Sequence, residues 1–123
     1  MLADPAVRQF QWRATASLLR RNVLRLYGLR LNGQLIAALY ALAERDILYC
    51  YLQGFDPAYG AFSPGAQILA AAIDDAIREK KTAVDFLRGP EAYKYAWGTR
   101  DQATYRICLR RPVEVQAPPI VAA

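Results

Sequence analysis

Asn32-Gly33 is the sequence feature that most restricts the fold, because it separates two apolar-rich runs of similar length. A type I′ turn needs a positive φ angle at both central residues, and Asn-Gly adopts it readily. The runs at 23–31 and 35–43 are therefore expected to pair as an antiparallel hairpin. A polar turn at 44–46 then leads to a third strand at 47–53, which predicts a meander.

Two helices are predicted from a polar residue followed by proline. Asp4-Pro5 supplies an N-cap and a first-turn proline, and apolar residues at helical spacing predict a helix over 5–20. Ser63-Pro64 repeats this logic at the start of a second amphipathic helix over 64–81. Between the third strand and this helix, residues 54–65 are expected to form a loop that contains glycine and proline.

The remaining segments predict one α/β domain. A fourth strand at 83–88 follows the second helix, which suggests a parallel crossover from the third strand. One or two helical turns are expected at 91–97 and a last strand at 103–110. We therefore expect a single domain over 1–111 and a loose tail over 112–123, where a Pro-Pro pair and no apolar pattern occur.

The chain has no histidine, which restricts its chemistry. Ser-His-Asp and Cys-His nucleophiles are excluded within this chain, and so is a zinc site that uses histidine. Acid–base chemistry must use Asp, Glu, Lys, Tyr, Cys or water. Cys50 and Cys108 fall in apolar, strand-like runs and are expected to be buried free thiols, although a disulfide or a catalytic thiol stays open.

The charge of the chain suits phosphate-rich partners. The net charge is +5, and most of the 16 basic residues are arginine, whose planar fork matches phosphate oxygens. A solvated basic surface explains the same composition. Nucleic-acid binding is a third and weaker interpretation, which would use Arg20, Arg21, Arg25, Arg30, Arg106, Arg110 and Arg111.

No segment of the sequence is expected to span a membrane. The longest apolar run, residues 35–43, is far shorter than the roughly 20 residues that a spanning helix needs. The polar and charged residues near the start do not resemble a signal peptide. These features predict a cytoplasmic protein, or a cytoplasmic fragment of a larger one.

The segment 83–98 contains the motif with the clearest functional meaning. Its Asp85-Phe86-Leu87-Arg88-Gly89 strand end is followed by Tyr93-Lys94 and by Trp97, and Pro64-Gly65 opens the preceding helix. This order resembles the GNAT acetyltransferase superfamily, and within it the CelD-type domain, named for cellulose biosynthesis and related to the FemAB aminoacyltransferases. The resemblance covers residues 10–111. It implies a GNAT-like, mixed and mostly antiparallel sheet flanked by helices, without the first strand and one helix of a full domain.

The resemblance also implies a cofactor and a site. Acetyl-CoA would be the acyl donor, with its diphosphate on the second helix and its pantetheine arm between the third and fourth strands. Asp85, Tyr93 and Tyr95 are the implied catalytic residues: a tyrosine protonates the leaving thiolate, and Asp85 acts as base or holds the amine. The implied cofactor-binding residues are Leu52, Gln53, Gly54, Ser63, Gly65, Ala66, Arg88 and Lys94. The usual glycine-rich phosphate loop of the superfamily is only loosely matched at 59–66.

Each site residue also has a structural interpretation. Tyr95 and Trp97 are equally the kind of aromatic residues that fill a core. Asp85 is as well suited to a structural ion pair with Arg88 or Lys94. Tyr49 and Tyr51 alternate along the third strand and are expected to pack.

Two functions follow. The first is an acyl-CoA-dependent N-acyltransferase-like domain, with an unknown amine acceptor and a place in envelope polysaccharide or peptidoglycan biosynthesis. The second is a degenerate GNAT module that dimerises or binds a partner without catalysis. A homo-oligomer is expected in either case, because a missing first strand leaves a sheet edge that a second subunit can cover.

Overall fold

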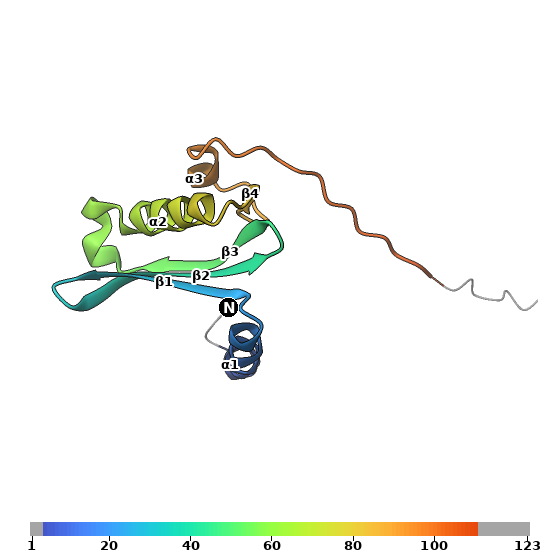
Figure 1. The fold of residues 1–123 in the computed structure, drawn as a ribbon, viewed down its shortest axis with the longest axis horizontal. Helices are drawn as coiled ribbons and strands as arrows, with labels where there is room; N and C mark the ends of the chain where they lie inside the picture. Colours follow the sequence, from blue (N-terminus) through green and yellow to red (C-terminus); the bar gives the residue numbers. More distant parts are fainter. Residues whose placement is uncertain (1–3, 111–123) are drawn as a thin grey trace, which may run out of the picture. The chain divides into compact units, whose positions relative to one another are not determined.

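The structure is a computed structural model that describes residues 4–110. The chain divides into two compact units, residues 1–90 and 91–123, which are described in turn. Figure 1 labels their helices and strands. The predicted tail at 112–123 lies outside the described residues.

Helix α1, Pro5–Arg20, begins and ends where the sequence predicts. The carboxylate of Asp4 accepts a hydrogen bond from the backbone N–H of Ala6 at 2.8 Å, which satisfies one of the first-turn donors. Pro5 occupies the first turn, where no N–H is needed, and Arg20 lies in the last turn.

The predicted meander is confirmed. Strands β1, Leu24–Leu31, and β2, Gln34–Glu44, pair antiparallel, and β2 pairs antiparallel with β3, Ile47–Phe55. The turn residues Asn32 and Gly33 have φ angles of 49° and 82°, as a type I′ turn requires. Strand β3 ends two residues later than predicted, at Phe55 instead of residue 53.

The predicted loop at 54–65 is wrong in its middle part. A 3-10 helix, η1 at Pro57–Phe62, fills it, because the carboxylate of Asp56 accepts the N–H of Ala58 at 3.0 Å. Asp56-Pro57 therefore starts a helical turn in the same way as Asp4-Pro5. Gly60 lies inside this turn and not in an open glycine-rich loop.

Helix α2, Pro64–Arg78, starts where it was predicted to start and ends three residues earlier. Its N-cap differs from the prediction, since Ser63 has a left-handed backbone with φ 50° and its side chain makes no capping hydrogen bond. Ser63 is also the residue that ends η1, where its N–H donates to the carbonyl of Gly60 at 2.9 Å. At the other end, Lys80 has a φ of 56°, which stops the helix.

Strand β4, Ala83–Asp85, is shorter than the predicted strand at 83–88. The carboxylate of Asp85 accepts the backbone N–H of Leu87 at 2.7 Å, and Leu87 itself has a φ of 58°. This local turn directs the chain away from the extended conformation. The predicted parallel crossover is confirmed, because β4 pairs parallel with β3.

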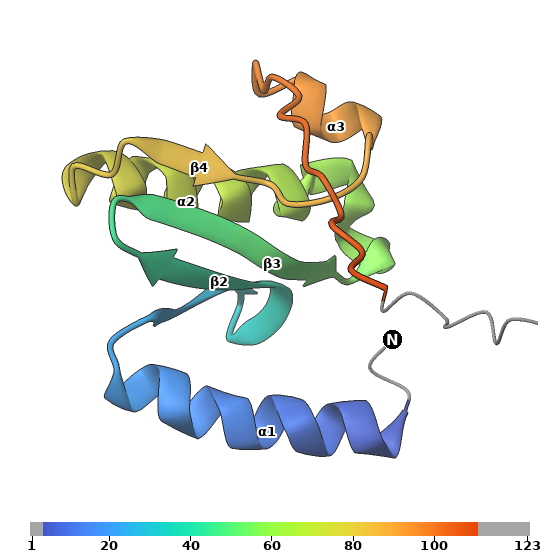
Figure 2. The same ribbon diagram turned by 90° about the vertical axis from the view of Figure 1, so that its right-hand side faces the viewer.

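The first unit has three layers. Helix α2 covers one face of the sheet and α1 covers the other, as Figures 1 and 2 show. The sheet order is β1-β2-β3-β4, so β1 lies at an edge. The buried core lies on the α2 side and consists of Ala37, Leu39, Ala41, Ala43, Leu48, Ile68, Leu69, Ala72 and Ala76.

The second unit contains α3, Ala92–Tyr95, which confirms the predicted helical turn. The predicted last strand at 103–110 is wrong: this stretch has no regular secondary structure and is exposed. A strand needs a hydrogen-bonding neighbour, and within residues 4–110 none pairs with it. Cys108 is exposed for the same reason, so its predicted burial is wrong. Cys50 is half-buried against the core.

Every helix within residues 4–110 is too short or too polar to cross a bilayer.

Candidate functional site

The first feature of the site is the point where β3 and β4 stop pairing. Their ladder spans three residue pairs and ends at Tyr49 and Asp85, whereas β3 continues to Phe55. Within residues 4–110, no strand pairs with residues 51–55 of β3 on the β4 side. We call residues 51–55 the open edge of β3; an edge of this kind offers backbone N–H and C=O groups to an extended ligand.

A bulge lies at the start of this open edge. Tyr40 is opposite Leu52 and Ala41 is opposite Cys50, so Tyr51 is an extra residue on β3. A bulge bends its strand, increases the local twist and leaves a residue outside the regular ladder. The bulge therefore separates the paired part of β3 from the open edge, and it places the predicted residues Leu52, Gln53 and Gly54 on that edge.

The open edge contacts the first turn of α2. Gln53 Nε2 donates a hydrogen bond to the carbonyl of Gly65 at 2.6 Å. A Cβ atom at Gly65 would lie 3.0 Å from that nitrogen and 3.4 Å from the ring of Phe55, so a larger residue would have to displace them. The structure thus brings together Gln53 and Gly65, two of the predicted cofactor-binding residues.

The same turn is a limited phosphate site. Pro64 has no N–H, and the N–H groups of Ala66 and Gln67 both donate to the carbonyl of Ser63, at 3.0 and 3.1 Å. Fewer backbone donors are therefore available than at an open glycine-rich loop. A diphosphate at this turn would need additional charge from a side chain such as Arg88, which follows β4.

Asp85 is half-buried at the end of β4, where one carboxylate oxygen accepts the N–H of Leu87. The turn that ends the strand therefore uses part of the hydrogen-bond-accepting capacity of the Asp85 carboxylate. The structure places Asp85 opposite Tyr49, the last residue of β3 that pairs with β4, and one residue separates Tyr49 from the bulge at Tyr51. This position gives Asp85 a structural role at the end of the ladder, and its catalytic role stays a prediction.

Tyr93, Lys94 and Tyr95 lie in the second unit, so their position relative to the open edge stays a prediction. The hydroxyl of Tyr95 donates to Asp101 Oδ1 at 2.9 Å, and this hydrogen bond raises the pKa of Tyr95 above its usual value. Lys94 Nζ lies 2.8 Å from Glu91 Oε2, and the hydrogen bond lowers the pKa of Glu91. Sequence reasoning missed Asp101, whose only signal is its place after the Gly98 turn.

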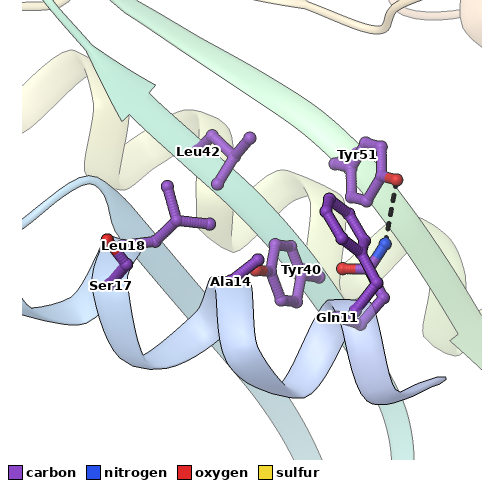
Figure 3. Close-up of a pocket in the computed structure, with 8 residues that line it drawn as sticks. Gln11, Ala14, Ser17, Leu18, Tyr40, Leu42 and Tyr51 are labelled. Carbon is purple, nitrogen blue, oxygen red and sulfur yellow. Dashed lines mark hydrogen bonds between the residues drawn. The ribbon is translucent and has the colours of Figure 1, made fainter. Parts of the chain in front are cut away.

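A pocket that sequence reasoning missed lies between α1 and the sheet, on the face opposite α2 (Figure 3). Its volume is about 350 Å³. We call it the α1 pocket; α1, β2 and β3 line it with Phe10, Gln11, Ala14, Ser17, Leu18, Tyr40, Leu42 and Tyr51. No local motif predicts such a pocket, because it forms only when α1 lies across β2 and β3.

Hydrogen bonds hold the aromatic wall of the α1 pocket. Gln11 Nε2 donates to the hydroxyl of Tyr51 at 3.0 Å, as Figure 3 shows. The rings of Tyr40 and Tyr51 meet edge to face, with centroids 5.8 Å apart. Tyr51 therefore packs on Tyr40 but stays 37% exposed, whereas Tyr49 is half-buried.

Within residues 4–110, no group of three His, Cys, Asp or Glu side chains is placed to hold a metal ion.

Known structures share this fold. An aminoglycoside acetyltransferase, meta-AAC0020, from an uncultured soil metagenomic sample and in complex with sisomicin, matches with a TM-score of 0.56 and 15% identity over 82% of this chain and 72% of that one. The aminoglycoside N-acetyltransferase AAC(6')-Iy in complex with CoA matches with a TM-score of 0.57 and 14% identity over 85% of this chain and 87% of that one. At these identities the likeness concerns the fold.

Sequence comparison agrees with the fold. No curated protein matches the chain in sequence. The family model described as "Acetyltransferase (GNAT) domain" matches residues 1–95, which include α1, the whole sheet, α2 and α3. The chain therefore belongs to the GNAT acetyltransferase domain family.

Proposed function

We propose that this chain is an N-acetyltransferase that uses acetyl-CoA and binds it along the open edge of β3. The observation that carries the proposal is the bulge at Tyr51 together with the end of the β3–β4 ladder at Tyr49 and Asp85. Members of the GNAT family use acetyl-CoA, and the family match supports this donor. The CoA in the complex of AAC(6')-Iy is consistent with it.

The residues of this chain suit two parts of acetyl-CoA, its pantetheine arm and its diphosphate. Residues 51–55 offer backbone hydrogen-bonding groups without a strand partner on the β4 side, which suits the amides of an extended pantetheine arm. The missing side chain at Gly65 lets Gln53 and Phe55 approach the first turn of α2. The diphosphate would rest on that turn, next to Ser63 and Ala66, with Arg88 as the predicted cation; Lys94 lies in the second unit, where it pairs with Glu91, and its role as a cation for the diphosphate stays a prediction.

When bound, acetyl-CoA supplies an acetyl group activated as a thioester. In the transfer a new N–C bond forms, the C–S bond breaks, the amine loses a proton, and the thiolate gains one. The chain has to stabilise negative charge on the carbonyl oxygen, and the N–H groups around Leu52, Gln53 and Gly54 are the proposed donors. Asp85 is the proposed group that orients the amine or accepts its proton.

Tyr95 is the proposed proton donor to the thiolate. Its hydroxyl now donates to Asp101, which raises the pKa of Tyr95, so this hydrogen bond has to break before the hydroxyl can donate to the thiolate. We expect Tyr95→Phe to lower kcat by roughly a hundredfold, in the range typical of a lost general acid, with little change in acetyl-CoA affinity. Tyr105→Phe, which changes a tyrosine that is 88% exposed and outside the proposed site, is the control; an unchanged kcat in Tyr95→Phe would remove Tyr95 from the mechanism.

Thermal denaturation with and without acetyl-CoA tests donor binding. A ligand at about 100 times its Kd adds about 2.7 kcal/mol to the free energy of unfolding, which is a shift of several degrees for a domain of this size. We expect Gly65→Ala to lose most of this shift, because its Cβ would displace Gln53. Gly60→Ala is the matched control, since nothing lies within 4 Å of its Cβ position. No shift in the unchanged protein would overturn the proposal.

A second candidate function is dimerisation, and the edge position of β1 favours it. This strand has eight residues, lies at the end of the sheet order and exposes Leu26 and Leu31. An apolar, unpaired edge is a template for another strand. Light scattering after gel filtration tests it: a dimer that Leu26→Lys dissociates supports the candidate, and a monomer at every concentration contradicts it. The CelD-type subfamily and a place in envelope polysaccharide or peptidoglycan biosynthesis stay predictions.

A further inference from the structure

The α1 pocket and the open edge of β3 meet at one residue. Tyr51 is the bulged residue that begins the open edge, and its side chain lines the α1 pocket. The other strand residues of the pocket, Tyr40 and Leu42, come from the adjacent strand β2. A molecule in this pocket therefore lies against the part of β3 where the proposed acetyl transfer takes place. This is the position that an acceptor needs.

The walls of the pocket are mainly apolar. Phe10, Ala14, Leu18 and Leu42 contribute hydrocarbon, and two tyrosine rings stand next to them. Phe10 is 65% exposed although it lines the pocket, so the protein itself leaves much of its ring uncovered. The volume of about 350 Å³ is near the lower end of the roughly 300–1,000 Å³ of small-molecule sites. These walls suit a small molecule with one apolar or aryl group.

The hydrogen bonds leave defined polar positions. The hydroxyl of Thr15 donates to the carbonyl of Gln11 at 2.8 Å, so Tyr40 is the donor in its 3.4 Å contact with Thr15. The oxygen of Tyr40 then retains lone pairs that can accept an N–H bond. Because Tyr51 accepts from Gln11, its own proton remains for a ligand. The pocket thus offers one acceptor and one donor among apolar walls.

The charges around the pocket disfavour a polycation. None of its lining residues is acidic. Helix α1 carries Arg8, Arg13 and Arg20 and no acidic residue, and β3 has no acidic residue either. The only carboxylate on β2 is Glu44 at its end. A ligand with several ammonium groups would meet repulsion and find no counter-charge in the lining.

We infer that the α1 pocket binds the acceptor of the proposed transfer and that this acceptor is a monoamine with an apolar or aryl group, not a polycationic amino sugar. The role as acceptor site rests on the proposed function, whereas the preference for aryl monoamines concerns binding alone. The aryl group lies between Phe10 and the two tyrosines, and the amine nitrogen points to the bulge at Tyr51. The transfer converts this amine to an acetamide and releases the CoA thiol.

Ligand-observed NMR on the full chain, without acetyl-CoA, tests the inference with phenethylamine and sisomicin as probes. We expect saturable binding of phenethylamine and at least tenfold weaker binding of sisomicin. Ala14→Leu fills the pocket and should weaken phenethylamine binding at least tenfold. Ala16→Leu is the matched control, because Ala16 is an exposed residue of α1 outside the lining. A folded Ala14→Leu variant that binds phenethylamine as well as the unchanged protein overturns the inference, and so does a preference for sisomicin.

The two binding experiments distinguish a failure of the acceptor inference from a failure of the proposed function. If phenethylamine binds in the pocket while acetyl-CoA causes no thermal shift, the monoamine site stands and the acetyltransferase proposal fails. If acetyl-CoA binds and phenethylamine does not, the acceptor inference fails alone. Acetylation of phenethylamine with a KM that Ala14→Leu raises at least tenfold, and Ala16→Leu leaves unchanged, supports both.

Discussion

Helices α1 and α2 cover opposite faces of one sheet, yet only α2 contributes buried side chains to the core. Five residues of α2 are buried, and α1 has none. Leu69 of α2 is 1% exposed, whereas Leu18 of α1 is only half-buried beside a pocket. The α2 face therefore has the density of a core, and the α1 face keeps space that a ligand can use.

The difference arises from the residues that face each helix. On the α2 side, β2 presents alanines and Leu39, and Ala72 and Ala76 of α2 let the helix approach closely. On the α1 side, the rings of Tyr40 and Tyr51 stand between β-strands and helix. Large rings hold α1 away from the strands, so a cavity remains. Small residues let a helix approach a sheet closely, and on the α2 face this contact gives a dense core.

The largest effect is expected from truncating a leucine on each helix. Leu69→Ala should lower the free energy of unfolding by about 2–5 kcal/mol, because it leaves a cavity in a dense core. Leu18→Ala should cost about 1 kcal/mol or less, since Leu18 already borders open space. Urea denaturation measures both. Equal losses would mean that the two faces are packed alike.

The next effect comes from enlarging an alanine on each helix. Ala72 is 0% exposed, so Ala72→Leu should overpack the core and cost about 1–3 kcal/mol. Ala14→Leu should be neutral or slightly stabilising, because the α1 pocket accepts the added carbons. The same denaturation experiment compares them. A large loss in Ala14→Leu would show that the pocket has no room.

A smaller effect separates the two tyrosine hydroxyls that join helix and sheet. Tyr27 of β1 donates to Asp75 Oδ2 on α2 at 3.0 Å in a partly buried place, and Tyr51 accepts from Gln11 of α1 at an exposed one. We expect Tyr27→Phe to cost about 1 kcal/mol and Tyr51→Phe clearly less, because water replaces an exposed hydrogen bond easily. A larger loss of stability in Tyr51→Phe than in Tyr27→Phe would mean that the stronger hydrogen bond between helix and sheet lies on the α1 face.

The smallest effect is a pH dependence that Tyr27, which faces α2, should cause. Burial, and then the hydrogen bond to Asp75, raises the pKa of Tyr27 above its usual value of about 10. The folded state therefore holds this proton more tightly than the unfolded state does, so the stabilisation is complete below pH ~10 and is lost as the pH rises further. Tyr27→Phe should reduce the loss of stability above pH ~10 in denaturation curves. Identical curves for Tyr27→Phe and the unchanged protein would contradict this origin.

Local rules predicted most of the first unit. Asp4-Pro5 starts α1 and Asn32-Gly33 makes the hairpin, because each dipeptide sets its own backbone angles. The same rules explain two misses: Asp56-Pro57 starts η1, and Asp85 ends β4 through the N–H of Leu87. The failed strand at 103–110 is of another kind. Its apolar alternation was present, but a strand also needs a partner.

The candidate site was predicted only in part. Leu52, Gln53 and Gly54 were named from the resemblance, and the structure shows that a bulge puts them on an open edge. The α1 pocket could not be predicted, because its residues come from α1, β2 and β3 and share no local pattern.

The sequence by itself determined the order of α1, β1, β2, β3, α2 and β4, the Asn32-Gly33 turn and the family, since these depend on residues close together in the chain. Only the tertiary structure decided which face of the sheet became the core and which kept a pocket. That choice depends on the sizes of side chains that meet across layers, such as Ala72 on one face and Tyr40 on the other. Packing between distant segments is settled by volume and contact, and no short pattern encodes it.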